Sequence, residues 1–272
     1  MYTPKEVAEN YLSTCRAKAA LPLGRMFLLA CLAGAFVALA GVASTAAAAT
    51  VGDPSLAKLV SGCVFPAGLA MVIVAGSELF TGNNLMIMGV LSRVISARRM
   101  LRNWSVVYLG NFVGAALVAA LCVLGHVFAA FDGRLAASVI SIAQAKASLS
   151  FGDAFVRGIL CNFLVCIAVW MASAAKSVPG KILAVFFPIM TFVVAGFEHS
   201  VANLFYIPAG LFAKSIPAYA ALAADAGLDL SGLTWSGFAI GNLLPVTLGN
   251  IIGGVLVGGL FWACWLRKGR GA

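Results

Sequence analysis

A long apolar run over residues 191–213, TFVVAGFEHSVANLFYIPAGLFA, carries four polar side chains at its centre: Glu198, His199, Ser200 and Asn203. An ionisable side chain at membrane depth is costly, and it marks a functional site by default. Gly196 precedes this centre, and Pro208 and Gly210 follow it. Glycine and proline at these positions argue against one continuous helix. The run therefore predicts two half-helices that meet at a polar break, a backbone arrangement tolerated in membranes only where protein or a water-filled cavity surrounds it.

The composition fits a polytopic membrane protein. Of the 272 residues, 62% are hydrophobic and 10% charged, and the mean hydropathy is +1.03. A net charge of +9 could suggest nucleic acid as a partner, but the basic residues lie in short loops between apolar runs, and we expect none. The seven cysteines lack paired metal-type spacing, and we interpret them as small buried hydrophobes. No metal and no cofactor is expected.

Hydropathy divides the chain into six expected spans. An amphipathic helix within residues 1–25, with Val7, Tyr11 and Leu12 near one face, is expected to lie at the membrane surface. The polar N-terminus argues against a cleaved signal peptide. A loop with Asp225 and Asp229 is expected before the last span. The expected spans cover 26–49, 57–95 with an interruption at 76–84, 104–130, 154–174, 181–213 with its break, and 236–266.

The distribution of lysine and arginine predicts the orientation. Thirteen of the eighteen basic residues fall on one side of the six spans, so both termini are expected to be cytoplasmic, in the cell's inner membrane. The other side is expected to hold the remaining five: Lys58, Arg134, Lys146, Arg157 and Lys214.

The two halves of the single domain repeat each other. Gly76, Glu78 and Asn83 recur 120 residues later as Gly196, Glu198 and Asn203, and VYLGNFVG at 107–114 resembles VTLGNIIG at 246–253. With three spans in each half, 26–130 and 153–266, the second copy must enter the membrane from the opposite side. Paired, interrupted hydrophobic segments of this kind indicate a transport site between inverted repeats.

At these motifs the chain resembles the formate/nitrite transporter family. The resemblance rests on SELFTGNN at 77–84, GFEHSVAN at 196–203, CNFLVC at 161–166 and PVTLGNIIGG at 245–254. It implies an all-α fold of six transmembrane helices with an aquaporin-like protomer, broken helices 2 and 5, and a homopentamer. It also implies passage of a small monovalent anion with protons, with formate as the first choice and hydrosulfide and nitrite as alternatives. The Gly-Asn-Asn after Thr81 resembles formate- and hydrosulfide-like members, which weakens a nitrite assignment.

The resemblance assigns roles to individual residues. His199 matches the central pore histidine, and Thr81 matches the threonine on the facing loop. Lys146 resembles a lysine of the outer vestibule. Further matches are the paired asparagines beside the pore, Asn162 and Asn250, and the apolar constriction residues, Phe65, Leu69, Phe80 and Phe192.

Physical chemistry explains why such residues would serve anion passage. A bare carboxylate crossing an apolar constriction faces a desolvation cost on the order of 20 kcal/mol in the idealised limit, whereas its neutral acid does not. We expect Lys146 to attract anions and His199, largely neutral, to act as proton relay or hydrogen-bond donor. Glu78 and Glu198 are interpreted as structural groups that cap half-helices or bond loop amides, with Asn83 and Asn203 beside them. His126 is interpreted as a packing residue.

Two other function classes fit less well. A membrane-embedded enzyme would need a nucleophile-base-acid set or metal ligands, and one central histidine without an Asp cluster argues against it. An aquaporin-type facilitator of neutral solutes would be expected to carry Asn-Pro-Ala at both breaks and an arginine filter. This chain has GNN and VAN at those positions and no arginine in either broken run.

Overall fold

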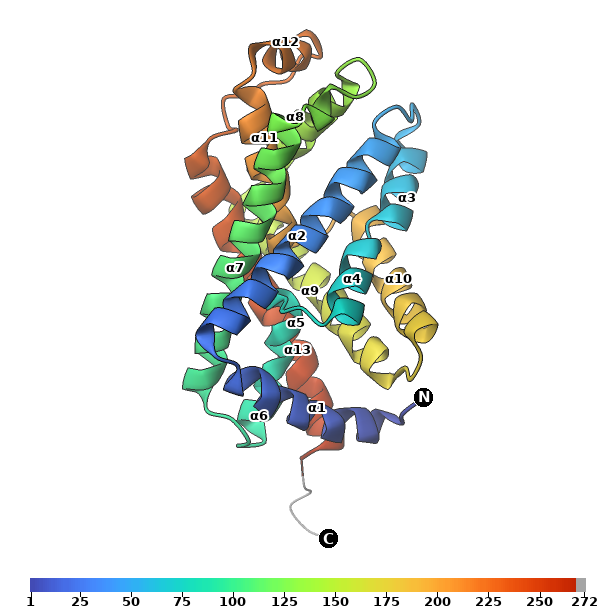
Figure 1. The fold of residues 1–272 in the computed structure, drawn as a ribbon, viewed down its shortest axis with the longest axis vertical. Helices are drawn as coiled ribbons and strands as arrows, with labels where there is room; N and C mark the ends of the chain where they lie inside the picture. The colour runs from blue at the N-terminus through green and yellow to red at the C-terminus, as the bar shows by residue number, and fades with distance from the viewer. Residues whose placement is uncertain (268–272) are drawn as a thin grey trace.

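The structure, a computed structural model, describes residues 1–267 as a bundle built of helices, with no strand among those residues. Lys268 and Arg270, two of the thirteen basic residues assigned to the cytoplasmic side from the sequence, lie outside the described residues. One end of the bundle is crossed by the N-terminal helix α1 (Pro4–Ala20), and the opposite end carries α8 (Arg134–Ala147) and α12 (Pro217–Asp225) (Figure 1). These ends are called the α1 side and the α8 side.

The first repeat contains two long helices and one broken segment. The long helices are α2 (Leu23–Ala48) and α7 (Ala97–Leu124). Between them the chain runs through α3 (Pro54–Val64), α4 (Ala67–Ala75), α5 (Phe80–Asn83), η1 (Asn84–Met86) and α6 (Ile87–Leu91). A short turn of helix, η2 (Val127–Ala129), follows α7.

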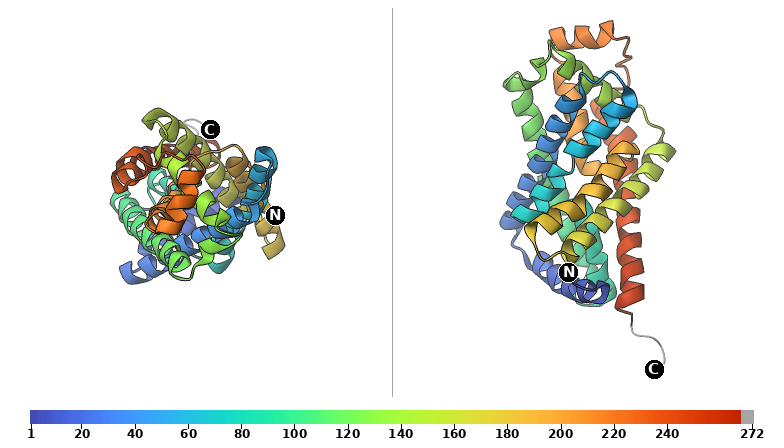
Figure 2. Two further views of the ribbon diagram at one scale, coloured as in Figure 1. Left: turned by 90° about the horizontal axis from the view of Figure 1, so that it is seen from above. Right: turned by 90° about the vertical axis from the view of Figure 1, so that its right-hand side faces the viewer.

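The second repeat has the same plan. Its long helices are α9 (Phe151–Ala174) and α13 (Leu244–Trp265), the latter preceded by a π-helical stretch, η3 (Gly237–Leu243). The broken segment consists of α10 (Val178–Val194) and α11 (Ser200–Lys214). Most helices run along the length of the bundle, whereas α1 and α12 lie across its two ends (Figure 2).

Equivalent glycines allow the long helices of each repeat to pack closely. A Cβ on Gly114 of α7 would overlap the carbonyl oxygen of Cys31 on α2, and a Cβ on Gly253 of α13 would overlap that of Ile159 on α9. Helix association in membranes depends on such small residues, because lipid gives no hydrophobic driving force between helices. The pairs α2–α7 and α9–α13 are thus built alike.

Helix α1 is amphipathic, as predicted, and packs against the bundle. Its start is fixed by a capping box, in which the Thr3 hydroxyl accepts from the Glu6 amide and the Glu6 carboxylate accepts from the Thr3 amide. These bonds from Thr3 lower the pKa of the Glu6 carboxyl. Val7 and Tyr11 are buried, and α1 contacts α6, α7, α9 and α13.

The observed helices match the expected spans with modest shifts at their ends. Five helices are long and apolar enough to cross a membrane: Leu23–Ala48, Pro54–Ala75, Ala97–Leu124, Phe151–Ala174 and Gly237–Trp265. The fifth expected span is represented by the half-length helices α10 and α11, and the segment Phe80–Leu91 is likewise short. The expected all-α fold with broken helices is confirmed.

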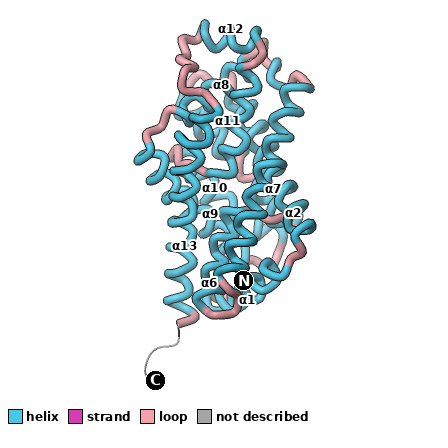
Figure 3. The backbone as a smooth tube through the Cα atoms, turned by 90° about the vertical axis from the view of Figure 1, so that its left-hand side faces the viewer, coloured by secondary structure: helices cyan, strands magenta, loops and turns pink. Residues whose placement is uncertain are grey.

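The connections differ from expectation in three respects. Helix α8 was not predicted, and Asp225 ends helix α12 instead of lying in a loop (Figure 3). His126 was wrongly interpreted as a packing residue, because it is exposed, follows the end of α7 and adopts a φ of 55°. Four cysteines are buried as predicted, Cys31 is partly buried, and Cys63 and Cys264 are exposed on apolar helix surfaces.

Candidate functional site: a polar centre between two charged cavities

Each broken segment turns at a glycine in the left-handed region. Gly76 has a φ of 76° and Gly196 a φ of 71°, and each directly follows the last turn of its half-helix. Residues other than glycine rarely adopt this backbone conformation, because their Cβ would crowd the backbone. The glycine lets the chain leave the helix and cross the interior as a short non-helical loop, the break loop, before the next half-helix begins.

On the α1 side, the break loop is anchored by a buried carboxylate. Glu78 accepts from Lys18 Nζ of α1 at 2.7 Å and from Asn83 Nδ2 at 2.7 Å. Asn83 Nδ2 also donates to Asn103 Oδ1 of α7 at 2.8 Å, and Asn103 Nδ2 lies 3.5 Å from the Lys18 carbonyl. The loop, α1 and α7 are therefore tied together by one polar network.

The α8 side carries the same network in the second repeat. Glu198 accepts from Lys146 Nζ of α8 at 2.8 Å and from Asn203 Nδ2 at 2.7 Å. Asn203 Nδ2 donates to Asn242 Oδ1 at 2.7 Å, and Asn242 Nδ2 donates to the Lys146 carbonyl at 2.9 Å. The inverted repeat suggested by the sequence therefore extends to the hydrogen bonds. The two glutamate carboxylates bond lysine and asparagine side chains. Contrary to expectation, they do not cap the half-helices or bond the loop amides.

An asparagine from the following long helix holds the first break loop. Asn111 Nδ2 donates to the carbonyls of Ala30 at 2.8 Å and Glu78 at 2.9 Å, and its Oδ1 accepts from the Phe80 amide at 3.0 Å. The side chain is fully buried. It thereby satisfies two backbone groups of the break loop, the Glu78 carbonyl and the Phe80 amide, and ties the loop to the Ala30 carbonyl inside α2.

Asn250 performs the same task in the second repeat. Its Nδ2 donates to the carbonyls of Gly158 at 2.8 Å and Glu198 at 2.9 Å, and its Oδ1 accepts from the Ser200 amide at 2.8 Å. Asn162, by contrast, donates to the Asn250 carbonyl. Asn162 also donates to the Thr81 carbonyl at 3.3 Å and to Asn84 Oδ1 at 2.8 Å. Neither asparagine lines the central cavity or the two larger cavities described below, and their place on the substrate pathway stays a prediction.

The two broken segments meet at His199, the N-cap of α11, and Thr81, in the first turn of α5. His199 Nε2 lies 2.8 Å from Thr81 Oγ1, and both residues are buried. His199 also caps α11, since its Nδ1 accepts from the Ala202 amide at 3.1 Å. A nitrogen that accepts carries no proton, so the neutral tautomer has its hydrogen on Nε2, which donates to Thr81. The Thr81 hydroxyl is then left free to donate onward.

Apolar side chains close the centre around this pair. The Phe65 and Phe192 rings meet edge to face at 5.9 Å, and the Phe192 ring lies 5.8 Å from the His199 ring. The central cavity measures about 10 Å³, room for about one water molecule. It is lined by His199 and seven apolar residues: Val37, Phe65, Leu69, Leu79, Val165, Ile189 and Phe192.

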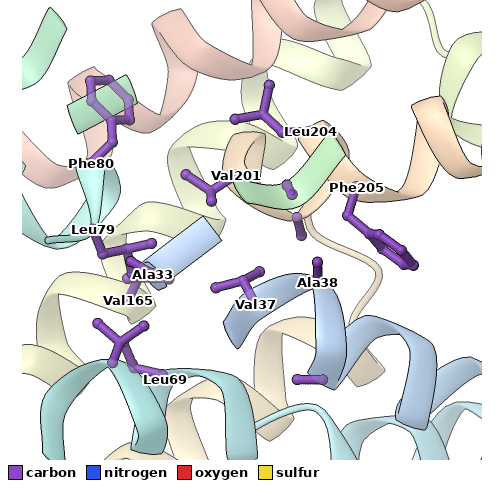
Figure 4. Packing of buried hydrophobic residues seen from close by; sticks show 14 of the residues in the cluster. Ala33, Val37, Ala38, Leu69, Leu79, Phe80, Val165, Val201, Leu204 and Phe205 are labelled. Carbon is purple, nitrogen blue, oxygen red and sulfur yellow. The ribbon is translucent and has the colours of Figure 1, made fainter. Parts of the chain in front are cut away.

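Phe80 does not belong to this constriction. Its ring contacts Tyr108 at 4.7 Å and Trp104 at 6.2 Å, on the α7 side of the break loop. Figure 4 shows Phe80 turned away from the point where Leu69, Leu79 and Val165 approach one another. Leu79, the preceding residue, takes the expected place; its backbone is extended, whereas Phe80 begins α5.

A larger cavity opens on each side of the constriction. The α8-side cavity, about 230 Å³, is lined by His199, Glu198, Lys146, Lys58 and Arg157 among others. The α1-side cavity, about 210 Å³, is lined by Glu78, Lys18 and Tyr11 among others. Within residues 1–267, no group of three or more His, Cys, Asp or Glu side chains could hold a metal ion.

Sequence reasoning missed several of these residues. Asn111 stood in the repeated LGN motif shared with Asn250, so its role was within reach. Lys18 offered no such signal, because it lies 60 residues from Glu78 in an amphipathic helix. Asn103 and Asn242 likewise became visible only in the folded chain.

Comparisons with known proteins agree with this architecture. The family model described as formate/nitrite transporter matches residues 5–264. The chain belongs to the formate/nitrite transporter family. A probable formate transporter of Methanothermobacter thermautotrophicus is 39% identical over 285 residues, covering 98% of each chain. The formate channel FocA of Haemophilus influenzae is 40% identical over 263 residues, covering 95% of this chain and 93% of its own.

A solved structure described as a pentameric formate channel with formate bound shares the fold. Its TM-score is 0.79 at 34% identity, and the match covers 90% of this chain and 98% of that one. These three relatives are described as channels or transporters, not as enzymes. The resemblance inferred from the sequence motifs is confirmed at the level of the family.

Proposed function

We propose that this chain forms a homopentameric channel for small monovalent anions, formate first, and that each protomer carries its own pathway. The observation that carries the proposal is the His199–Thr81 hydrogen bond, set in an apolar constriction between two charged cavities. The pentameric formate channel with the same fold supports both the assembly and the substrate.

The geometry suggests how the anion would pass. An anion enters a water-filled cavity and approaches the constriction, where the falling dielectric favours its neutral acid over the charged form. The anion takes a proton from hydronium in the cavity, which is left as water, and crosses Phe192 and Leu79 as the neutral acid. Neutralisation avoids a desolvation cost that remains several kcal/mol even after relaxation.

His199 would act through its Nε2 hydrogen. Protonation of the imidazole at Nδ1 would break the bond from the Ala202 amide, which favours a neutral ring. From the neutral ring, Nε2 donates to Thr81, whose hydroxyl donates in turn to a substrate oxygen. The pair would thus orient the substrate at the point where the proton is exchanged between substrate and water.

We further propose that the protein lies in the cytoplasmic membrane, surrounded by lipid, with the α1 side facing the cytoplasm. The basic residues at the α1 end support this orientation, including Arg93 between α6 and α7 and Arg98 and Arg99 in the first turn of α7. Both termini would then be cytoplasmic, and the α8-side cavity, which Lys146 lines, would open toward the cell exterior.

Purified protein in liposomes tests the proposal. We expect formate to be taken up fastest from a panel of formate, nitrite, hydrosulfide, acetate and lactate, with glycerol excluded. Faster uptake of hydrosulfide or nitrite would reassign the substrate within the family. Flux of every anion equal to that of protein-free liposomes would refute the proposed function.

A further inference from the structure

The two cavities beside the constriction differ in charge, although their networks are equivalent. The α1-side cavity is lined by one cation, Lys18, and one carboxylate, Glu78, which pair at 2.7 Å. The α8-side cavity has the equivalent pair, Lys146 with Glu198 at 2.8 Å. In each pair the charges compensate each other, so neither lysine supplies net attraction for an anion.

Two further cations line the α8-side cavity and have no counterpart in the α1-side cavity. They are Lys58 of α3 and Arg157 of α9, and both are exposed. Within residues 1–267, the salt bridges are Lys18–Glu78 and Lys146–Glu198, so the charges of Lys58 and Arg157 have no carboxylate within 4.0 Å. The lining of this cavity therefore carries a surplus of two positive charges.

The repeat shows that this surplus is a departure from symmetry. The Arg157 carbonyl accepts from the Glu198 amide at 3.3 Å, just as the Leu29 carbonyl accepts from the Glu78 amide at 3.2 Å. Arg157 therefore corresponds to an apolar residue, Leu29. Val178 lies 120 residues after Lys58, the same spacing that separates the two glutamates. By this spacing, Lys58 also corresponds to an apolar residue in the other repeat.

Lys58 lies where the α8-side cavity meets a third, more open one. That outermost cavity, about 580 Å³, is lined by Lys58 together with hydroxyl residues of α2, α3 and α8, including Thr45, Ser61, Ser138 and Ser141. Lys58, Thr45 and Ser61 line both cavities, and no aspartate or glutamate lines the outermost one. An anion arriving through it meets Lys58 before it meets Lys146 or His199.

We propose that Lys58 and Arg157 form an anion-capture site at the α8-side mouth, and that this site makes entry from that side saturate at lower substrate concentration than entry from the α1 side. The inference rests on the proposed function, since it requires that the pore admit a small anion. A unit charge about 7 Å from the anion in a water-filled cavity changes the local anion concentration about threefold, and salt screens the effect. The two side chains together should therefore change it about tenfold.

The test measures formate entry at low and high ionic strength in right-side-out and inverted membrane vesicles. The double variant Lys58→Gln, Arg157→Gln should raise the half-saturation concentration of formate about tenfold for entry from the α8 side at low salt. Entry from the α1 side, and entry from either side at high salt, should match the parent. Lys58→Arg should retain the parent value, and Arg134→Gln, which removes a charge from the same end outside all three cavities, is the matched control.

The possible failures are distinguishable. Unchanged half-saturation on the α8 side at low salt, or an equal change on both sides, would overturn the capture site while the channel function stands. Absence of formate flux in parent vesicles, relative to vesicles without the protein, would overturn the proposed function itself. Equal flux of variant and parent at high salt shows that the variant has folded and assembled.

Discussion

Asn250 and Asn111 are predicted to contribute equally to stability, because each bonds two backbone groups of its break loop and one carbonyl of a neighbouring helix. Replacing Asn250 with Ala removes both donors and the acceptor, which leaves the Gly158 and Glu198 carbonyls and the Ser200 amide without these partners. The site is fully buried. Since water does not reach such a position readily, the Glu198 carbonyl and the Ser200 amide stay unpaired after the substitution, whereas the Gly158 carbonyl keeps its partner within α9.

The magnitude can be bounded from general hydrogen-bond energetics. Side-chain hydrogen bonds in a membrane protein average about 0.6 kcal/mol, which gives about 2 kcal/mol for three. An unsatisfied buried group costs about 1–3 kcal/mol, so the two unpaired loop groups set an upper bound of about 6 kcal/mol. We expect Asn250→Ala to lower the free energy of unfolding by about 2–6 kcal/mol, and Asn111→Ala to lower it by the same amount within about 1 kcal/mol.

The assay is SDS titration of purified protein in mixed micelles, followed by circular dichroism, with size-exclusion chromatography to report assembly. Asn10→Ala, at an exposed position of α1, is the control for the same chemical change. The reasoning is refuted if Asn250→Ala costs no more than Asn10→Ala. A large cost at Asn250 with none at Asn111 would refute the equivalence of the two break loops.

Two further predictions concern the pathway. Thr81→Val keeps the side-chain shape but removes the hydroxyl that bonds His199, so formate flux should fall about tenfold or more at parent stability; unchanged flux for every anion would remove Thr81 from the mechanism. Lys146→Met leaves the buried Glu198 carboxylate uncompensated and should lower stability by about 3–5 kcal/mol, with partial recovery in the double variant Lys146→Met, Glu198→Gln; equal loss in single and double variants would show that charge compensation is not what Lys146 provides.

The sequence predicted the elements that depend on local pattern. Long apolar runs marked the spans, and glycine with glutamate marked both breaks. The pairing of His199 with Thr81 followed from the motifs of the family, and the structure places these two side chains within hydrogen-bond distance. Helices α8 and α12 were missed because they are short and lie in connections without a long apolar run.

What the sequence left open depends on contacts between distant segments. The Lys18–Glu78 pair joins an amphipathic helix to a break loop, and no spacing rule connects the two. Phe80 was assigned to the constriction in place of Leu79, because side-chain direction at the boundary between the break loop and α5 follows from backbone conformation and not from periodicity. The role of Lys146 also changed, since a salt bridge to Glu198 was not visible in the loop-like sequence around it.

The central claim is that the substrate crosses the constriction as its neutral acid beside His199. The most direct measurement is proton movement per formate in liposomes that hold an internal pH dye, with the membrane potential set by a potassium gradient and valinomycin. The account predicts about one proton per formate above the protein-free background and uptake independent of potential. In His199→Asn, which lacks the imidazole Nε2–H, it predicts loss of this coupling at parent stability. Parent uptake that follows the membrane potential without lumen acidification, or parent-like coupling in His199→Asn from pH 5 to 8, would contradict it.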